Sequence, residues 1–177
     1  MDYAILLHFD KNSEARIFDL WKEAAKSGGD SYLIDSGLRP HITLAIFEDT
    51  DIQSFCNKLE IFSKQIKKLD LKLGSIGTFA SSQGVLYLSP IMTDELVELH
   101  KGFYKYFEGD LDGINSYYMP NNWVPHCSIS INNSIETFVS ILKRIIENFE
   151  PLDIRIREVS IIESKPAIRY IKSYEIE

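Results

Sequence analysis

Residues 40–44 read PHITL, and the same pattern returns as PHCSI at residues 125–129. In an extended strand, side chains two positions apart lie on the same face. Each stretch therefore predicts a strand that carries an imidazole and a hydroxyl group on one face and apolar side chains on the other. The polar pairs are His41 with Thr43 and His126 with Ser128.

The alternation of polar and apolar residues continues beyond both stretches. It predicts that Ile46 lies on the apolar face of the first strand, and that Ser130 and Asn132 lie on the polar face of the second. A polar face on a central strand must meet water, a partner or a ligand, because an unpaired buried polar group costs about 1–3 kcal/mol. The polar faces are therefore the expected location of a binding or catalytic site.

Further matches follow the same order along the chain. The two histidines are 85 residues apart. Three other features recur 83 residues later: the apolar helix pattern from Ile52 at Ile135, LDLKL at Leu69 as LDIRI at Leu152, and Tyr87 as Tyr170. Four matches in register predict an internal repeat of residues 30–90 and 115–177.

The predicted fold is an α/β (α+β) bilobal domain that spans residues 1–177. We expect two lobes related by a pseudo-twofold axis, each an antiparallel-rich sheet backed by two helices. The two histidine strands would then face each other across a central cleft.

Hydrophobic periodicity and turn residues place the individual elements. Helices are predicted over residues 13–27, 52–66, 93–108 and 135–149, and strands over 3–9, 41–47, 69–79, 84–89, 126–131, 152–162 and 167–176. Thr50 with Gln53 and Asn133 with Glu136 are predicted helix caps. Residues 81–84 are a predicted turn between two strands.

Composition limits the classes of function. The chain has 177 residues, of which 45% are hydrophobic, and a net charge of −7. A length of 177 residues suits one domain, and an acidic total argues against extended binding of a nucleic-acid backbone. Cys56 and Cys127 are expected to be buried thiols, which fits a reducing cytoplasm. Residues 1–12 lack the basic start of a signal peptide, and no apolar run is long enough to span a membrane.

Two opposed imidazoles can share the proton transfers of phosphate-ester chemistry. A neutral histidine accepts a proton from the attacking oxygen, and a protonated one donates to the leaving oxygen. His41 and His126 are therefore the candidate catalytic residues, with Thr43 and Ser128 donating hydrogen bonds to the phosphate. This scheme needs no metal and no cofactor.

Three residues beside the motifs are candidate substrate contacts. Arg39 could neutralise a phosphate, and Trp123 and Tyr118 could stack on a nucleobase. Each has a structural alternative, because Arg39 could be a solvated surface residue and the aromatic residues could pack within their own loop.

The stretches RPHITLAIF, GVLYLSP and WVPHCSISI, together with the closing strand that contains Tyr170, resemble the 2H phosphoesterase superfamily. The closer resemblance is to its 2′-5′ RNA ligase and RNA 2′,3′-cyclic phosphodiesterase family, and it covers nearly the whole chain. It implies a bilobal fold with His41 and His126 as catalytic residues and Thr43 and Ser128 as phosphate binders.

The expected function is a cytoplasmic, metal-independent phosphodiesterase acting on a 2′,3′-cyclic phosphate. Its expected partner is a small nucleotide or an RNA end, with no membrane and no extended nucleic acid. Two alternatives stay open: a 2′-5′ RNA ligase activity at the same site, and a module that binds a nucleotide without turning it over. The sequence leaves the oligomeric state open.

Overall fold

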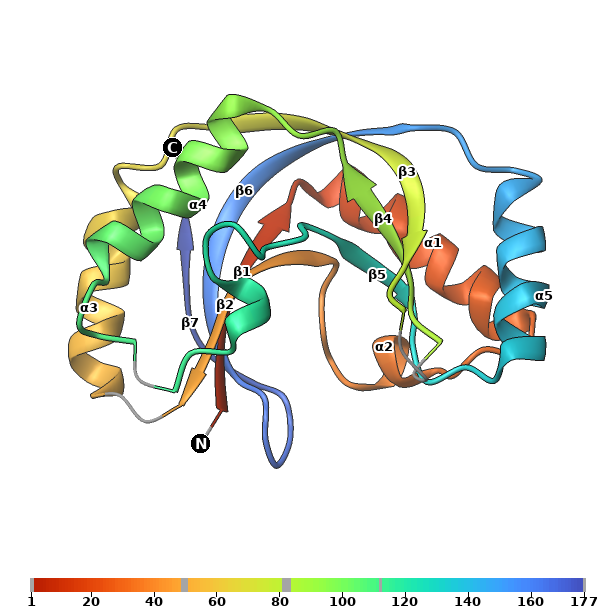
Figure 1. Ribbon diagram of the computed structural model, residues 1–177, viewed down its shortest axis with the longest axis horizontal. Coiled ribbons are helices and arrows are strands. Elements are labelled where there is room, and N and C mark those ends of the chain that lie inside the picture. Colours follow the sequence, from red (N-terminus) through yellow and green to blue (C-terminus); the bar gives the residue numbers. More distant parts are fainter. Residues whose placement is uncertain (1, 49–50, 81–83, 112, 177) are drawn as a thin grey trace.

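One curved antiparallel sheet runs through the part of the chain that the structure describes, which is residues 2–48, 51–80, 84–111 and 113–176 of a computed structural model (Figure 1). Its strands are β1 (Asp2–Phe9), β2 (His41–Glu48), β3 (Leu69–Thr78), β4 (Leu86–Pro90), β5 (Cys127–Ser130), β6 (Leu152–Glu163) and β7 (Arg169–Glu175). The helices are α1 (Lys11–Lys26), α2 (Tyr32–Asp35), α3 (Ile52–Ser63), α4 (Asp94–Tyr106) and α5 (Ile135–Ile146), and a 3-10 turn, η1, spans Ser116–Tyr118.

The strands follow the order β2-β1-β6-β3-β4-β5, and β7 pairs with β6 beside β3. The two halves of the molecule therefore share a continuous sheet instead of having a sheet each. They join where β3 pairs with β6, with Leu71 opposite Ile154. The second edge of β1 is covered by β6, from the end of the chain, while the second edge of β4 is covered by β3, from its first half.

Two pairs of helices flank the sheet at opposite ends of the molecule (Figure 1). α3 packs with α4, where the rings of Phe62 and Phe103 meet edge to face at 5.8 Å. α1 packs with α5 and against β5. Helix α1 follows β1 but lies with the second half of the sheet, and α4 follows β4 but lies with the first half. These crossings tie the two halves into one apolar core.

The predicted α+β fold with an antiparallel sheet and paired helices is confirmed, while the duplication and the central cleft stay predictions. The element order β1-α1-β2-α3-β3 recurs as β4-α4-β5-α5-β6. This order would place the boundaries of a repeat at β1–β3 and β4–β6. It differs from the predicted pairing of Tyr87 with Tyr170, because β4 then corresponds to β1 and not to β7.

Helix caps differ from the predicted ones in detail. The N-cap of α3 is Asp51, whose carboxylate accepts from Ser54 N–H, and Thr50 lies outside the described residues. The N-cap of α5 is Ser134 instead of Asn133, because the Asn133 side chain donates to the Gly84 carbonyl at 2.7 Å. Of the predicted turn at residues 81–84, residues 81–83 also lie outside the described residues.

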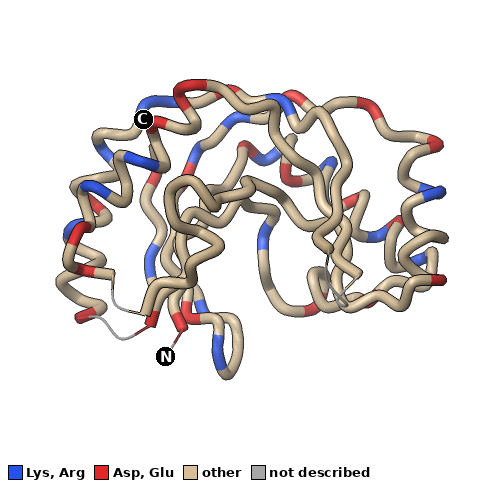
Figure 2. The backbone as a smooth tube through the Cα atoms, viewed as in Figure 1, with Lys and Arg blue, Asp and Glu red and all other residues tan. Residues whose placement is uncertain are grey.

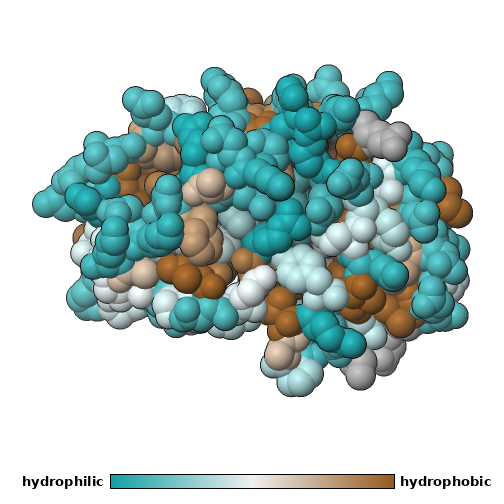
Figure 3. Space-filling model, turned by 180° about the vertical axis from the view of Figure 1, so that it is seen from behind, coloured by the Kyte–Doolittle hydropathy of each residue, from teal (hydrophilic) through white to brown (hydrophobic). Residues whose placement is uncertain are grey.

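Charged residues are spread along the outer helices and several strands, whereas the segments around the start of β5 are largely uncharged (Figure 2). The rear surface is mostly hydrophilic, with separate apolar areas along its lower part (Figure 3). Among the described residues, no helix combines the length and apolar character that a membrane crossing requires. Cys56 and Cys127 are both free and buried, as predicted.

Candidate active site

His41 is the first residue of β2, and its ring is fixed by a local hydrogen bond. Its Nδ1 lies 2.6 Å from the carbonyl oxygen of Arg39. Because a carbonyl only accepts, Nδ1 carries the proton and Nε2 keeps its lone pair. Among the described residues, Nε2 has no protein partner, so it is available to a ligand.

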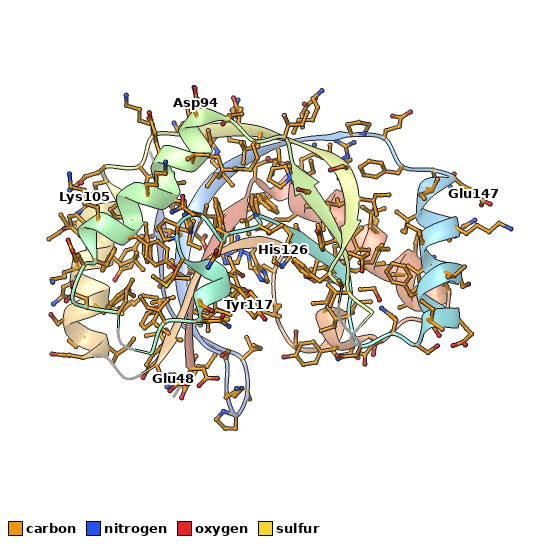
Figure 4. The ribbon with its side chains drawn as sticks, viewed as in Figure 1. Glu48, Asp94, Lys105, Tyr117, His126 and Glu147 are labelled. Carbon is orange, nitrogen blue, oxygen red and sulfur yellow. The ribbon has the colours of Figure 1, made fainter. Side chains whose placement is uncertain are left out.

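His126 directly precedes β5 and has the same local geometry. Its Nδ1–H donates to the carbonyl of Val124 at 2.7 Å, which again leaves Nε2 unprotonated in the neutral ring. The imidazole lies edge-on to Phe79, with ring centroids 4.9 Å apart, and 5.1 Å from the ring of Tyr87. Figure 4 places His126 near the centre of the molecule, between the two helix pairs.

The sheet curves so far that its edge strands, β2 and β5, come into contact. At this contact, burial raises the pKa of the Cys127 thiol, and the backbone of His41 partly opposes that rise. Burial and, to a smaller extent, the charge of His126 lower the pKa of His41 to about 4. Burial also lowers the pKa of His126. The two imidazoles therefore lie close enough for the charge of one to disfavour protonation of the other.

Both histidine strands contain a β-bulge three residues after the histidine. Leu6 pairs with Thr43 and Ile5 with Ala45, so Leu44 has no partner. In β5, Tyr87 pairs with Ser128 and Leu86 with Ser130, so Ile129 has none. One extra residue in a strand moves every side chain after it to the opposite face of the sheet.

The bulges make the predicted alternation wrong beyond the motifs. Ile46 packs on the face of the sheet that carries Ala4 and Leu6, which is the His41 face. Ser130 is buried on the opposite face, where its hydroxyl bonds to Asn133 at 3.1 Å. Asn132 lies beyond β5 in an exposed turn with a φ of 57°.

Thr43 and Ser128 each expose a hydroxyl group and anchor their backbone. The carbonyl of Thr43 accepts the indole N–H of Trp123 at 2.9 Å, and that of Ser128 accepts the indole N–H of Trp21 at 2.8 Å. Both side chains are partly exposed, and within the described residues neither hydroxyl has a protein partner. The two hydroxyls are therefore free to donate to a ligand from fixed positions.

Arg39 is bound within the protein and is not a free cation. Its guanidinium donates to Glu14 at 2.7 Å and to Glu158 at 2.6 Å. Two carboxylates neutralise its charge, so a role as the main phosphate contact has no support here. The three side chains instead connect α1, β6 and the segment before His41.

The side chain of Trp123 supports the strand that carries Thr43. Its indole stacks on His100, with ring centroids 3.9 Å apart and planes 4° from parallel. His100 is buried, and its Nε2–H donates to the carbonyl of Tyr118 at 2.9 Å. One indole face and the indole N–H are thus occupied by protein, and the contact that Tyr118 makes here is through its backbone.

A Trp123→Phe variant tests this supporting role. It keeps a ring on His100 but loses the N–H that holds Thr43, so we expect about 1 kcal/mol less stability towards denaturant. We also expect a loss of up to about tenfold in kcat/KM, because the Thr43 hydroxyl is less well placed. Trp21→Phe, which removes the equivalent bond to Ser128, is the parallel variant for the second motif. An increase in KM that depends on the nucleobase would instead place the indole against the substrate.

Two arginines near the C-terminus, Arg155 and Arg169, are paired away from the histidines. Arg155 bonds to Asp70 across β6 and β3, and Arg169 donates to Glu163 at 2.6 Å. Arg155 lines a hollow of about 740 Å³ where β3 meets β6, together with Asp70 and Asp153. Among the described residues, no three His, Cys, Asp or Glu side chains are grouped so as to hold a metal ion.

Comparison with known proteins identifies a family that matches most of this chain. The model of the 2′-5′ RNA ligase superfamily matches residues 10–167. A Bacillus licheniformis protein provisionally named a phosphoesterase is 28% identical over 133 residues, covering 73% of this chain and 70% of its own.

Solved structures share the fold at low sequence identity. The structure of E. coli LigT complexed with NADP+ superposes with a TM-score of 0.62 at 14% identity, covering 98% of this chain and 96% of that one. The protein TT0787 of Thermus thermophilus gives 0.63 at 12% identity and covers 99% and 98%. E. coli LigT complexed with 3′-AMP gives 0.60 at 13% identity and covers 98% and 96%.

Proposed function

This chain belongs to the 2′-5′ RNA ligase superfamily, and from that membership we propose that it is a phosphodiesterase that opens 2′,3′-cyclic phosphates by paired-histidine acid–base catalysis. The observation that carries the proposal is the matched geometry of the two histidines. Each donates Nδ1–H to the carbonyl two residues before it and keeps Nε2 for a ligand. His41 begins β2 and His126 directly precedes β5, and these two edge strands meet. Beside them lie two hydroxyls that have no partner among the described residues.

In the proposed reaction, a water molecule attacks phosphorus while Nε2 of one histidine takes its proton. The bond from phosphorus to the ribose 2′ or 3′ oxygen breaks, and the other histidine protonates that oxygen. Thr43 and Ser128 donate hydrogen bonds to the non-bridging oxygens, where negative charge builds up. The product is a ribose monophosphate, and no step requires a metal ion.

The electrostatics favour His41 as the base and His126 as the acid. His41 is neutral over most of the pH range, because burial and the charge of His126 together lower its pKa to about 4. His126 is also neutral in the free site at pH 7, since burial lowers its pKa. An incoming phosphate carries negative charge, which raises the pKa of the histidine that meets it and supplies the acid.

A small, ribose-phosphate substrate is supported by two features. The net charge of −7 weighs against extended binding of a nucleic-acid backbone, and the arginine nearest the motif, Arg39, is neutralised by two carboxylates. The related fold of LigT has been solved with 3′-AMP and with NADP+. Ligation is the second candidate, supported by the family description, because attack by a ribose hydroxyl in place of water joins two RNA ends.

Turnover of a panel of nucleoside 2′,3′-cyclic phosphates in excess chelator tests the function. We expect a bell-shaped profile of kcat/KM with its maximum on the acid side of the ordinary histidine pKa of about 6.5. Activity falls below about pH 4 because His41 becomes protonated and cannot act as the base. It falls towards higher pH because His126, whose pKa is lowered, loses the proton that the acid must donate.

The profile of kcat should lie at higher pH than that of kcat/KM, because it reports the phosphate-bound site. No turnover of any cyclic phosphate, together with joining of RNA fragments that carry a cyclic end, would favour the ligase instead. Tight binding without either reaction would indicate a nucleotide-binding module.

A further inference from the structure

A third histidine, His8, lies directly beside His41 in the sheet. The two residues are opposite each other in the pairing of β1 with β2. Their rings meet edge to face, with centroids 6.0 Å apart. His8 is completely buried, and its Nδ1–H donates to the carbonyl of Pro40 at 3.1 Å. It therefore contacts both the imidazole of His41 and the peptide that leads into it.

The other ring nitrogen of His8 has no protein partner. Nε2 is buried, and none of the described residues offers it a hydrogen bond. Leaving a polar atom unpaired in the interior is unfavourable, so a phenylalanine would suit the packing at this position better. The reason for a histidine at this position is therefore the hydrogen bond that its Nδ1–H donates to Pro40, in the segment before His41.

The second histidine has a donor at the corresponding position. Leu7 pairs with Ile42 in the first half, and Leu88 pairs with Cys127 in the second. The residue after Leu88 is Ser89, whose hydroxyl donates to the carbonyl of Pro125 at 3.4 Å. Each proline carbonyl that precedes a site histidine is thus held from the adjacent strand, by His8 in one half and by Ser89 in the other.

Other contacts fix the same segment. The backbone N–H of Arg39 donates to the Tyr170 hydroxyl at 3.1 Å, and the Tyr170 ring lies 5.7 Å from that of His8. Glu158 of β6 is opposite His8 in the sheet and is paired with Arg39. Together with His41, these are the titratable and charged groups that the structure places around His8.

We propose that His8 is a positioning residue: through its hydrogen bond to Pro40 it holds His41 in the orientation and Nδ1–H tautomer that leave Nε2 for the substrate. The catalytic consequence rests on the proposed function, whereas the effect on the His41 ring does not. His8 stays neutral in this role, because burial and the neighbouring charges of His41 and Arg39 together lower its pKa to about 3.

The test compares His8→Phe with His8→Ser. Phenylalanine keeps an aromatic ring against His41 but has no donor for Pro40. Serine places a hydroxyl at the position where Ser89 does the same task in the other half. We expect His8→Phe to melt close to the wild-type temperature, because the lost hydrogen bond is offset by removal of an unpaired buried nitrogen.

The principal measurement is the tautomer and pKa of His41 in the free protein, from long-range proton–nitrogen NMR spectra. In His8→Phe we expect a mixture of tautomers and a pKa nearer the ordinary value of about 6.5, whereas His8→Ser should resemble the wild type. We also expect kcat/KM for a cyclic phosphate to fall about 10- to 100-fold in His8→Phe only. The acidic limb of its pH profile should move to higher pH, because the pKa of His41 rises.

A His41 ring that keeps its tautomer and pKa in His8→Phe overturns the proposal, as does a His8→Ser variant that behaves like His8→Phe. If the wild type turns over no cyclic phosphate, the proposed function fails, but the NMR comparison still decides the role of His8. Ser89→Ala is the matched control in the other half. It should alter the ring of His126 and leave that of His41 unchanged.

Discussion

His41→Ala and His126→Ala are each expected to lower kcat/KM for a 2′,3′-cyclic phosphate by about 10²- to 10⁴-fold, the usual contribution of one acid or base group. The double variant should lose little more than the worse single variant, because the two residues act in one step. Both proteins should fold normally, since neither imidazole is part of the apolar core. Steady-state kinetics and a thermal melt of each variant supply the measurement.

An ester with a good leaving group separates the acid from the base. p-Nitrophenolate leaves without needing a proton, so a nucleoside p-nitrophenyl phosphate should restore much of the activity of His126→Ala. The same substrate should not rescue His41→Ala, because water still has to be deprotonated. Rescue of His41→Ala alone would show that His41 is the acid and His126 the base. Activity that survives in the double variant would show that neither residue takes part in the chemistry.

Loss of the two hydroxyls is expected to have the next largest effect. Thr43→Val and Ser128→Ala each remove one donor to the phosphate oxygens, at an expected cost of about 10²- to 10³-fold in kcat. Valine matches the shape of threonine, and within the described residues neither hydroxyl bonds to the protein. Stability should therefore hardly change.

The matched control is Ser130→Ala, because its hydroxyl bonds to Asn133 on the opposite face of β5. It should reduce stability by about 1 kcal/mol and leave kcat unchanged. If Thr43→Val and Ser128→Ala raised KM with no change in kcat, the hydroxyls would bind substrate and transition state equally well. That result would contradict the proposed stabilisation of developing charge.

The period-two pattern around the two motifs was sufficient to predict the strands and the faces of the histidines and their hydroxyl partners. It failed three residues later, because the bulges at Leu44 and Ile129 add a residue without leaving a mark in the hydrophobic pattern. Ile46 and Ser130 were therefore assigned to the wrong faces. A bulge depends on how two strands pair, and that information is absent from either strand alone.

Candidate contacts near the motifs were predicted less well than the motifs themselves. Arg39 and Trp123 are close to the histidines in sequence, yet their side chains bind Glu14 and the Thr43 carbonyl. Proximity in sequence could not show these partners, which come from distant strands and helices. The contact of His8 with Pro40 likewise depends on the register of β1 against β2, which neither strand shows alone.

In each half of the sheet, one strand comes from the other half of the chain: β6 covers β1, and β3 covers β4. This arrangement has a consequence during synthesis. Because β6 covers the second edge of β1, the first half of the sheet cannot be completed until Leu152–Glu163 has left the ribosome. A nascent chain that ends before this strand would expose an unpaired edge, which is where strands from other chains attach. The sheet edge beside the pairing of His8 with His41 is thus covered only after this strand has been made.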